Sequence, residues 1–166
     1  QGKIELHSLS QGVMAKLIAG QGEGRKELKT RVGVGTFLDP STGGGSNIVS
    51  NKQSNLVRAE GGELVFTLPD ITVALFSAPY ADIEGNIYFK NAATITENRE
   101  AAAAARRNGG LVMAAVCDII EKEPDNISLP AEAVDAIVVN PRNEQTGGVL
   151  QRHYLPMFTA GAGTDI

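Results

Sequence analysis

The stretch Ile71-Thr-Val-Ala-Leu-Phe-Ser-Ala78 is a nearly continuous apolar run, and Pro79 follows it. Such a run is typical of a central strand that is covered on both faces, and the proline predicts its end. Residues 111–120 and 134–139 form two further apolar runs. Together the three runs predict the sheet of an α/β protein.

A helix is expected over residues 96–107, between the first two of these strands. Five alanines lie at 101–105, acidic residues come early and Arg106 and Arg107 come last, as the helix dipole favours. Asn108-Gly109-Gly110 is a stop signal. The two arginines could bind an anion, but capping of the last carbonyl groups is the favoured interpretation.

Upstream, residues 4–9 alternate apolar and polar side chains, which predicts a strand with His7 on its polar side. His7 could face a cleft there, but a position on the surface is the favoured interpretation. Ser10 has the character of an N-cap, and a helix is expected over 13–18, with glycines at 20–24 ending it. Gln11 then lies in the turn where a helix N-terminus presents unpaired N–H groups. Its carboxamide can donate to a carboxylate or thioester oxygen, or it can merely extend the cap, and the residues leave both open.

Residues 32–47, called the glycine loop below, read Val-Gly-Val-Gly-Thr-Phe-Leu-Asp-Pro-Ser-Thr-Gly-Gly-Gly-Ser-Asn. Glycine allows positive φ and close approach of a ligand, so the loop is either a ligand cradle or a surface linker. No Lys-Ser or Lys-Thr follows the glycines, and the spacing is not Gly-x-Gly-x-x-Gly at the start of a helix. Nucleotide phosphate binding is therefore a weak interpretation.

A β-hairpin is predicted over 56–66 around Gly61-Gly62, and a short strand over 87–89. Between them, Asp82 and Glu84 have the character of solvated turn formers rather than of a catalytic acid pair. From residue 143 the hydrophobic period is lost, which predicts one domain over 1–142 and an extended arm over 143–166. His153 and Tyr154 fall on this arm.

The 166 residues fit one domain, and a net charge of −4 without a basic cluster makes nucleic acid an unlikely partner. The single cysteine and the two histidines are far apart in the sequence and do not have the spacing of a metal site. A single cysteine also fits a reducing compartment, so the chain is expected to be cytoplasmic. Cys117 is expected to be a buried thiol. No apolar stretch reaches the length of a membrane span, and a first residue other than Met suggests a piece cut from a longer chain.

Four stretches taken in order resemble the family I CoA-transferases, above all the first domain of the acetate or propionate enzymes and, more distantly, succinyl-CoA:3-ketoacid CoA-transferase. The stretches are Leu9-Ser10-Gln11-Gly12, the glycine loop, Ala81-Asp-Ile-Glu-Gly-Asn-Ile87 and Arg107-Asn-Gly-Gly-Leu-Val112. The resemblance covers about residues 2–149, without the family's upstream strand and loop. It implies a three-layer α/β/α fold with a mainly parallel sheet, shared with sugar-phosphate isomerases and glucosamine-phosphate deaminases, plus the hairpin as an appendage.

The resemblance also implies an activity. Such enzymes move CoA between an acyl-CoA and a carboxylic acid through a glutamyl-CoA thioester, with coenzyme A as a substrate and no bound cofactor or metal. Gln11 corresponds to the glutamine that contacts the substrate carboxylate. Five glycines of the glycine loop correspond to positions that border the same cleft, namely Gly33, Gly35, Gly43, Gly44 and Gly45.

The nucleophilic glutamate of the family belongs to a second domain, so no catalytic residue is assigned on this chain. Glu97 lies in Thr-Glu-Asn-Arg, where the family motif has glycine in place of Arg99, and it falls in the first-domain helix. The resemblance therefore predicts a truncated first domain that is inactive alone and needs a second domain or subunit. The alternatives are a non-catalytic module that binds an acyl-CoA or a carboxylate, or an oligomerisation module; open sheet edges favour a homo-oligomer.

Overall fold

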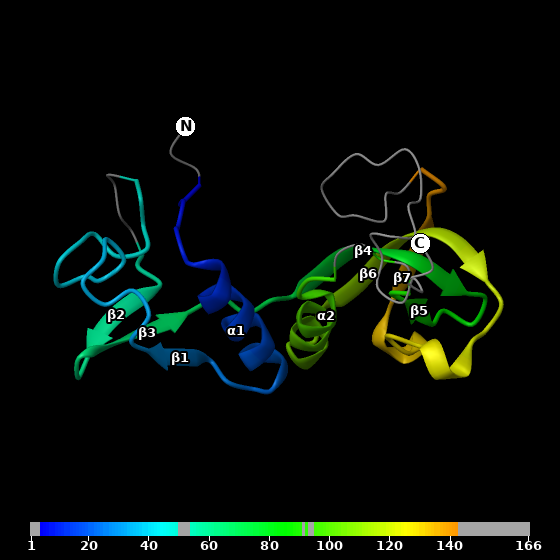
Figure 1. Cartoon of the computed structure of the whole chain (residues 1–166), viewed down its shortest axis with the longest axis horizontal. Coiled ribbons are helices and arrows are strands. Elements are labelled where there is room, and N and C mark those ends of the chain that lie inside the picture. Colours follow the sequence, from blue (N-terminus) through cyan, green and yellow to red (C-terminus); the bar gives the residue numbers. More distant parts are fainter. Residues whose placement is uncertain (1–3, 50–53, 91, 93–94, 143–166) are drawn as a thin grey trace, which may run out of the picture. The chain divides into compact units, whose positions relative to one another are not determined.

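The computed structural model describes residues 4–49, 54–90, 92 and 95–142 (Figure 1). The chain divides into two compact units, Gln1–Asp70 and Ile71–Ile166. The domain predicted over 1–142 thus contains two units. The arm predicted over 143–166, with His153 and Tyr154, lies outside the described residues.

Unit 1 holds a helix and a small antiparallel sheet. The elements are α1 (Gln11–Gly22), β1 (Glu27–Thr30), β2 (Val57–Glu60) and β3 (Glu63–Thr67). The strand order is β1-β3-β2, with β3 antiparallel to both neighbours. The predicted hairpin is therefore confirmed as β2 and β3. The third strand, β1, was not predicted, because its sequence Glu-Leu-Lys-Thr is mostly polar.

The core of unit 1 forms between α1 and β3. Val13 and Leu17, four residues apart on one face of α1, are each 3% exposed and belong to the same cluster as Leu64 and Phe66. The helix continues past Gly20 to Gly22, further than the glycines predict. Near its end Gln21 is buried, and its amide nitrogen donates to the carbonyl of Pro69 at 2.8 Å, which fixes this end to the segment after β3.

The prediction of a strand over residues 4–9 is wrong. This segment makes one isolated antiparallel bridge, between His7 and Asn47. Alternating apolar and polar residues form a strand only when a neighbouring strand pairs with them along their length. Here the pairing partner is Asn47, the last residue of the glycine loop.

Unit 2 is an α/β structure with a mixed sheet, which confirms the fold class. Its elements are β4 (Val73–Asp82), β5 (Ile87–Tyr88), α2 (Asn98–Arg107), β6 (Leu111–Ile120), η1 (Pro124–Asn126), η2 (Ala131–Ala133) and β7 (Ala136–Val139). The order is β5-β4-β6-β7, in which β4, β6 and β7 are parallel and β5 is antiparallel to β4. The strands and the helix predicted in this half are confirmed.

Pro79 does not end β4, which continues to Asp82. The register runs from the pair Ala78–Val116 to the pair Tyr80–Asp118 and passes over Pro79 and Cys117. A proline lacks the N–H that a ladder needs, and a gap in the pairing accommodates it without ending the strand.

The two faces of this sheet differ. On one face, Ala102 and Ala105 of α2 pack in a cluster with Ala74, Phe76 and Val112. The other face leaves four large side chains exposed: Val73 by 52%, Leu75 by 70%, Leu111 by 53% and Val138 by 62%. The expectation that β4 is covered on both faces is thus wrong for the described residues. No helix among them is both long and apolar enough to cross a membrane.

Candidate substrate-binding site

The first turn of α1 has no side-chain cap. Ser10 has the extended conformation of an N-cap residue, but its side chain makes no capping hydrogen bond, and the first turn holds no acidic residue. The first amide N–H groups of a helix have no partner within the helix and carry its positive dipole end. Gln11 is the first residue of α1 and is exposed, so the sequence placed it correctly. Its contact with a substrate stays a prediction.

The glycine loop is organised by Asp39, which is 4% exposed. One carboxylate oxygen accepts the N–H of Gly35 at 2.9 Å, and the other accepts the N–H of Ser41 at 2.9 Å together with the Ser41 hydroxyl. These bonds, led by the Ser41 hydroxyl, lower the pKa of Asp39. The carboxylate therefore shapes the loop and does not face a ligand.

Four of the five glycines have a structural reason to be glycine. Gly33, Gly35 and Gly45 have φ values of 90°, 75° and 78°, which side chains rarely tolerate. At Gly43 a Cβ atom would lie 2.4 Å from the carbonyl oxygen of Phe37. Gly44 is exposed beside it. The loop is thus a defined structure rather than a loose linker, and its substrate contacts stay a prediction.

The end of the glycine loop lies against the segment that leads into α1. The N–H of Ser8 donates to the carbonyl of Ser46 at 2.7 Å, and the N–H of Ile48 donates to the carbonyl of Leu6 at 3.0 Å. Gln11 follows Ser8 by three residues, so its backbone lies within roughly 10 Å of this contact. The structure therefore joins the end of the glycine loop to the segment before Gln11, and a shared site of Gln11 and the five glycines stays a prediction.

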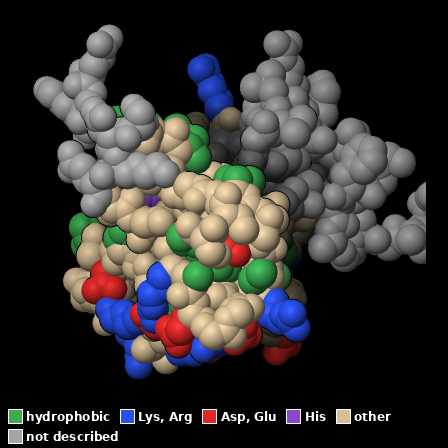
Figure 2. Space-filling model, turned by 90° about the vertical axis from the view of Figure 1, so that its left-hand side faces the viewer, with side chains coloured by type: hydrophobic (Ala, Val, Ile, Leu, Met, Phe, Trp, Pro, Cys, Tyr) green, Lys and Arg blue, Asp and Glu red, His purple; other side chains and the backbone are tan. Residues whose placement is uncertain are grey.

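The glycine loop presents an uncharged surface. Its single charged residue is the buried Asp39, whereas Val32, Val34 and Phe37 are exposed by 53%, 42% and 60%. Figure 2 shows this end of unit 1, where Lys, Arg, Asp and Glu side chains gather along the lower margin and the surface above is mostly uncharged. The charges of the small sheet pair with one another, as Arg58 does with Glu27 at 2.8 Å. Such a surface suits an acyl group or a neutral chain better than a polyanion.

A polar cluster that the sequence did not indicate holds the loop and the segment before α1. His7 is partly buried, with its Nδ1 atom 2.9 Å from the Ser46 hydroxyl and its Nε2 atom 3.2 Å from a Glu5 carboxylate oxygen. The prediction that His7 lies on the surface is therefore wrong. Glu5 is two residues from His7 in the sequence, but Ser46 is 39 residues away, so the spacing of residues could not have predicted the whole cluster.

In unit 2, Asp82 is not the solvated turn former that the sequence suggested, because it is 2% exposed. Its carboxylate accepts the backbone N–H groups of Glu84 and Asn86, both at 3.0 Å. It also accepts the Asn86 amide at 2.8 Å and the Tyr88 hydroxyl at 2.6 Å. Burial alone raises the pKa of Asp82, but these hydrogen bonds outweigh it and lower the pKa to about 2. Glu84 fits the turn-former prediction, being exposed and paired with Lys122 at 2.6 Å.

The structure also gives the positions of three further candidates in unit 2, Arg106, Glu97 and Cys117. Arg106 pairs with Asp135 at 2.8 Å and donates to the carbonyl of Ala133. Glu97 is the N-cap residue of α2, and its side chain makes no capping hydrogen bond. Cys117 is only partly buried, so the expected buried thiol is wrong. Cys117 is the residue of β6 at which the pairing with β4 is interrupted, and its thiol donates to the carbonyl of Pro141 at 3.7 Å.

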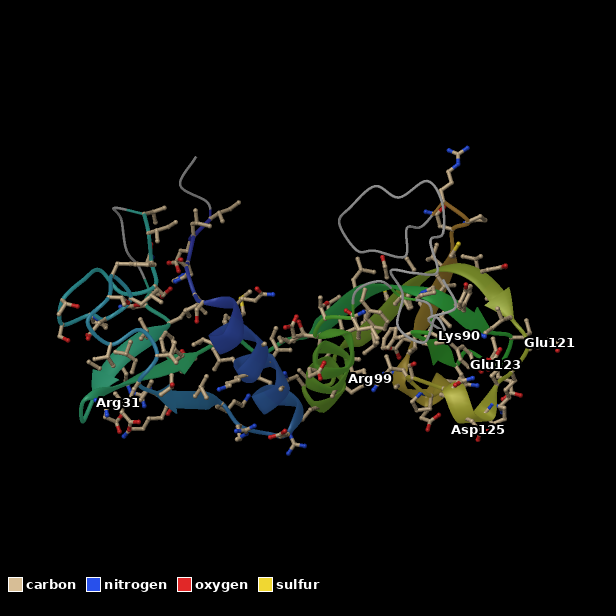
Figure 3. All side chains as sticks on the ribbon, in the orientation of Figure 1. Arg31, Lys90, Arg99, Glu121, Glu123 and Asp125 are labelled. Carbon is tan, nitrogen blue, oxygen red and sulfur yellow. The ribbon has the colours of Figure 1, made fainter. Side chains whose placement is uncertain are left out.

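Charged side chains around β5 also pair within unit 2. Figure 3 labels Lys90 and Glu123, whose side chains form an ion pair, and Arg99, whose guanidinium lies 5.5 Å from the centre of the Phe89 ring. Among the described residues, no group of three or more His, Cys, Asp or Glu is placed to hold a metal ion.

Comparison with known proteins identifies the class. Residues 1–140 match the family model described as Coenzyme A transferase, and the chain belongs to this family. It is 34% identical over 165 residues to the caffeate CoA-transferase of Acetobacterium woodii. The match covers 94% of this chain and 31% of that protein. It is 28% identical over 156 residues to the acetate CoA-transferase YdiF of Escherichia coli K12, covering 89% of this chain and 29% of that protein. The chain thus spans about a third of the length of these relatives.

Solved structures agree on the fold. The acyl-CoA transferase YdiF of Escherichia coli O157:H7, solved as a thioester complex with CoA, superimposes with a TM-score of 0.79 at 24% identity. The match covers 92% of this chain and 33% of that one. Glutaconate CoA-transferase of Acidaminococcus fermentans has a TM-score of 0.59 at 18% identity, covering 85% of this chain and 47% of that one.

Proposed function

We propose that this chain is the first-domain part of a CoA-transferase that moves CoA between an acyl-CoA and a small carboxylic acid. The observation that carries the proposal is the position of Gln11 at the uncapped start of α1, close to the end of the glycine loop, in a member of this family. Gln11 donates its amide N–H to the substrate carboxylate, and the adjacent helix N-terminus favours the negative charge. The uncharged glycine loop borders the acyl group.

The chemistry proceeds through a glutamate supplied by a second domain or subunit. Its carboxylate attacks the thioester carbonyl to give an acyl anhydride, and the released CoA thiolate attacks the anhydride to give a glutamyl-CoA thioester and the free acid. The acceptor acid then takes the CoA by the reverse steps. Each tetrahedral stage carries an oxyanion, which a neutral donor such as Gln11 stabilises without adding a competing charge.

A transfer assay with acetyl-CoA and propionate, read by mass spectrometry, tests this function. The chain alone should not turn over, whereas the chain continued into the glutamate-bearing second domain of a CoA-transferase relative should. In that active protein, Gln11→Ala should lower kcat/KM by about 100-fold, because one oxyanion donor is lost. Lys16→Ala, which changes another exposed residue of α1, should leave the rate unchanged.

Turnover by the isolated chain would contradict the need for a second domain. Full activity of Gln11→Ala would contradict the role of Gln11. If no second domain yields turnover and the chain still binds acetyl-CoA to saturation, the proposal fails and a non-catalytic binding module replaces it.

We propose further that the protein is cytoplasmic and forms homo-oligomers. A single, partly buried cysteine agrees with a reducing compartment, and an exposed apolar sheet face such as that around Leu75 tends to be covered. Light scattering on the purified chain should give a mass of at least two chains; a monomer at high concentration would contradict this. Cell fractionation tests the location.

A further inference from the structure

His7 connects three segments of unit 1 through its two ring nitrogens. Its Nδ1 atom lies 2.9 Å from the hydroxyl of Ser46, at the end of the glycine loop. Its Nε2 atom lies 3.2 Å from a carboxylate oxygen of Glu5, and 3.4 Å from the hydroxyl of Ser54. The imidazole is therefore held from both sides.

Glu5, His7 and Ser46 are linked in the order carboxylate, imidazole, hydroxyl, as in a hydrolytic triad. These three residues cannot act as such a triad. Ser46 is 0% exposed, so no substrate carbonyl can reach its hydroxyl. The cluster must instead act on the positions of the segments that it joins.

The protons of the cluster can be assigned from the atoms around Ser46. The side-chain oxygen of Asn55 accepts the N–H of Ser46 at 2.8 Å and its hydroxyl at 2.9 Å. The N–H of Leu56 donates to the Ser46 hydroxyl oxygen at 2.8 Å. A hydroxyl has one proton and two lone pairs, so the remaining lone pair accepts a proton from the Nδ1 atom of His7.

The other ring nitrogen faces a group that can only accept. The Ser54 hydroxyl donates to the same Glu5 oxygen that Nε2 faces, and this bond, followed by that of His7, lowers the pKa of Glu5. An ionised carboxylate beside Nε2 needs a proton on that nitrogen as well. The geometry therefore fits an imidazolium with N–H groups on both sides, and among the described residues Glu5 is the titratable group that faces it.

We propose that His7 is a positioning residue whose charged ring clamps the segment before α1 onto the end of the glycine loop, and that loss of the Nε2 proton loosens this contact. Because Gln11 follows the clamped segment by a few residues, protonation of His7 sets how firmly the start of α1 is held beside the loop. The inference does not require the proposed function, since it concerns the free chain.

Amide exchange measured by NMR on the whole 166-residue chain, without substrate, tests the proposal. The reporters are the N–H groups of Ser8 and Ile48, which donate across the contact at 2.7 and 3.0 Å. Their protection factors should fall about fivefold in the step of a pH series at which the His7 ring loses its Nε2 proton, and the 15N signals of the ring report that loss directly. Before that step, both ring nitrogens should carry protons. The N–H of Val112, bound to Asp135 in unit 2, is the internal reference and should keep its protection.

Two variants separate the charge from the hydrogen bond. Glu5→Gln should abolish most of the pH step, because a neutral ring can accept from the glutamine amide. His7→Asn places a neutral donor near the Nδ1 position and should give protection that does not change with pH. A His7 ring without a proton on Nδ1, wild-type protection that does not change when the Nε2 proton is lost, or a full pH step in Glu5→Gln would each overturn the proposal.

Discussion

Two buried carboxylates, one in each unit, organise loops in different ways. Asp39 accepts bonds from Gly35 and Ser41, all within four residues of itself. Asp82 accepts four bonds, and its partners connect onward to other elements. One carboxylate therefore shapes a local loop, whereas the other ties a turn to the rest of unit 2.

The onward connections run through the partners of Asp82. The Tyr88 hydroxyl also accepts the N–H of Glu123 at 3.1 Å, and the side-chain oxygen of Asn86 accepts the N–H of Ala131 at 2.9 Å. In the glycine loop, the connections to other segments run through Ser46 instead of Asp39, because the buried Ser46 hydroxyl bonds to His7, Asn55 and Leu56. A buried carboxylate can therefore fix one loop through its nearest neighbours or join a turn to distant segments, and only the positions of its partners distinguish the two cases.

The largest expected effect is that of Asp82→Asn on unit 2. The substitution replaces an acceptor of four hydrogen bonds with an amide that cannot accept them all, so the free energy of unfolding of unit 2 should fall by about 3 kcal/mol. Urea unfolding followed by NMR intensities of unit 2 amides measures it. Asp39→Asn is the matched change, and a loss in unit 1 as large as that in unit 2 would erase the distinction.

Acid should weaken the same turn. The pKa of Asp82 is lowered from 3.8 to about 2, so its stabilising contribution is complete above the unfolded value and is lost as the pH falls through the folded value. The shift corresponds to about 2 kcal/mol. The difference in unfolding free energy between wild type and Asp82→Asn should therefore shrink by this amount between about pH 5 and pH 2; a constant difference would show that the carboxylate charge does not matter.

A smaller effect is expected in the glycine loop. Gly43→Ala places a methyl group against the Phe37 backbone and should cost about 1 to 2 kcal/mol in unit 1, because the loop must shift. Gly12→Ala is the control, since nothing lies within 4 Å of the new Cβ atom and alanine favours the helix. Urea unfolding should show opposite signs for the two changes, and equal effects would mean that the packing at Gly43 is unimportant.

The sequence predicted unit 2 better than unit 1 because apolar runs mark central strands directly. Residues 111–120 were predicted as a strand and are β6, and the alanine-rich helix is α2. In unit 1, β1 is polar and exposed on one side, and residues 4–9 alternate without a strand partner. Pattern alone could not show which neighbour each segment finds.

Turn and loop signals predicted the local structure at Gln11 and the glycines, whereas the long-range contacts of the candidate site left no signal in the sequence. Ser10 marked the start of α1, and the glycines marked a loop with positive φ. The burial of Asp82 and the partners of His7 depend on residues that only folding brings together. A turn carboxylate has the same sequence signature whether it is solvated or buried.

We propose that the start of α1 and the glycine loop bind the substrate. An NMR titration of the whole chain with acetyl-CoA, and separately with acetate, tests this binding through the backbone amide shifts. We predict saturating shifts at Gln11 and Gly12 and along residues 33–45, with unit 2 amides little changed. Shifts confined to unit 2, or none at saturating ligand, would contradict it.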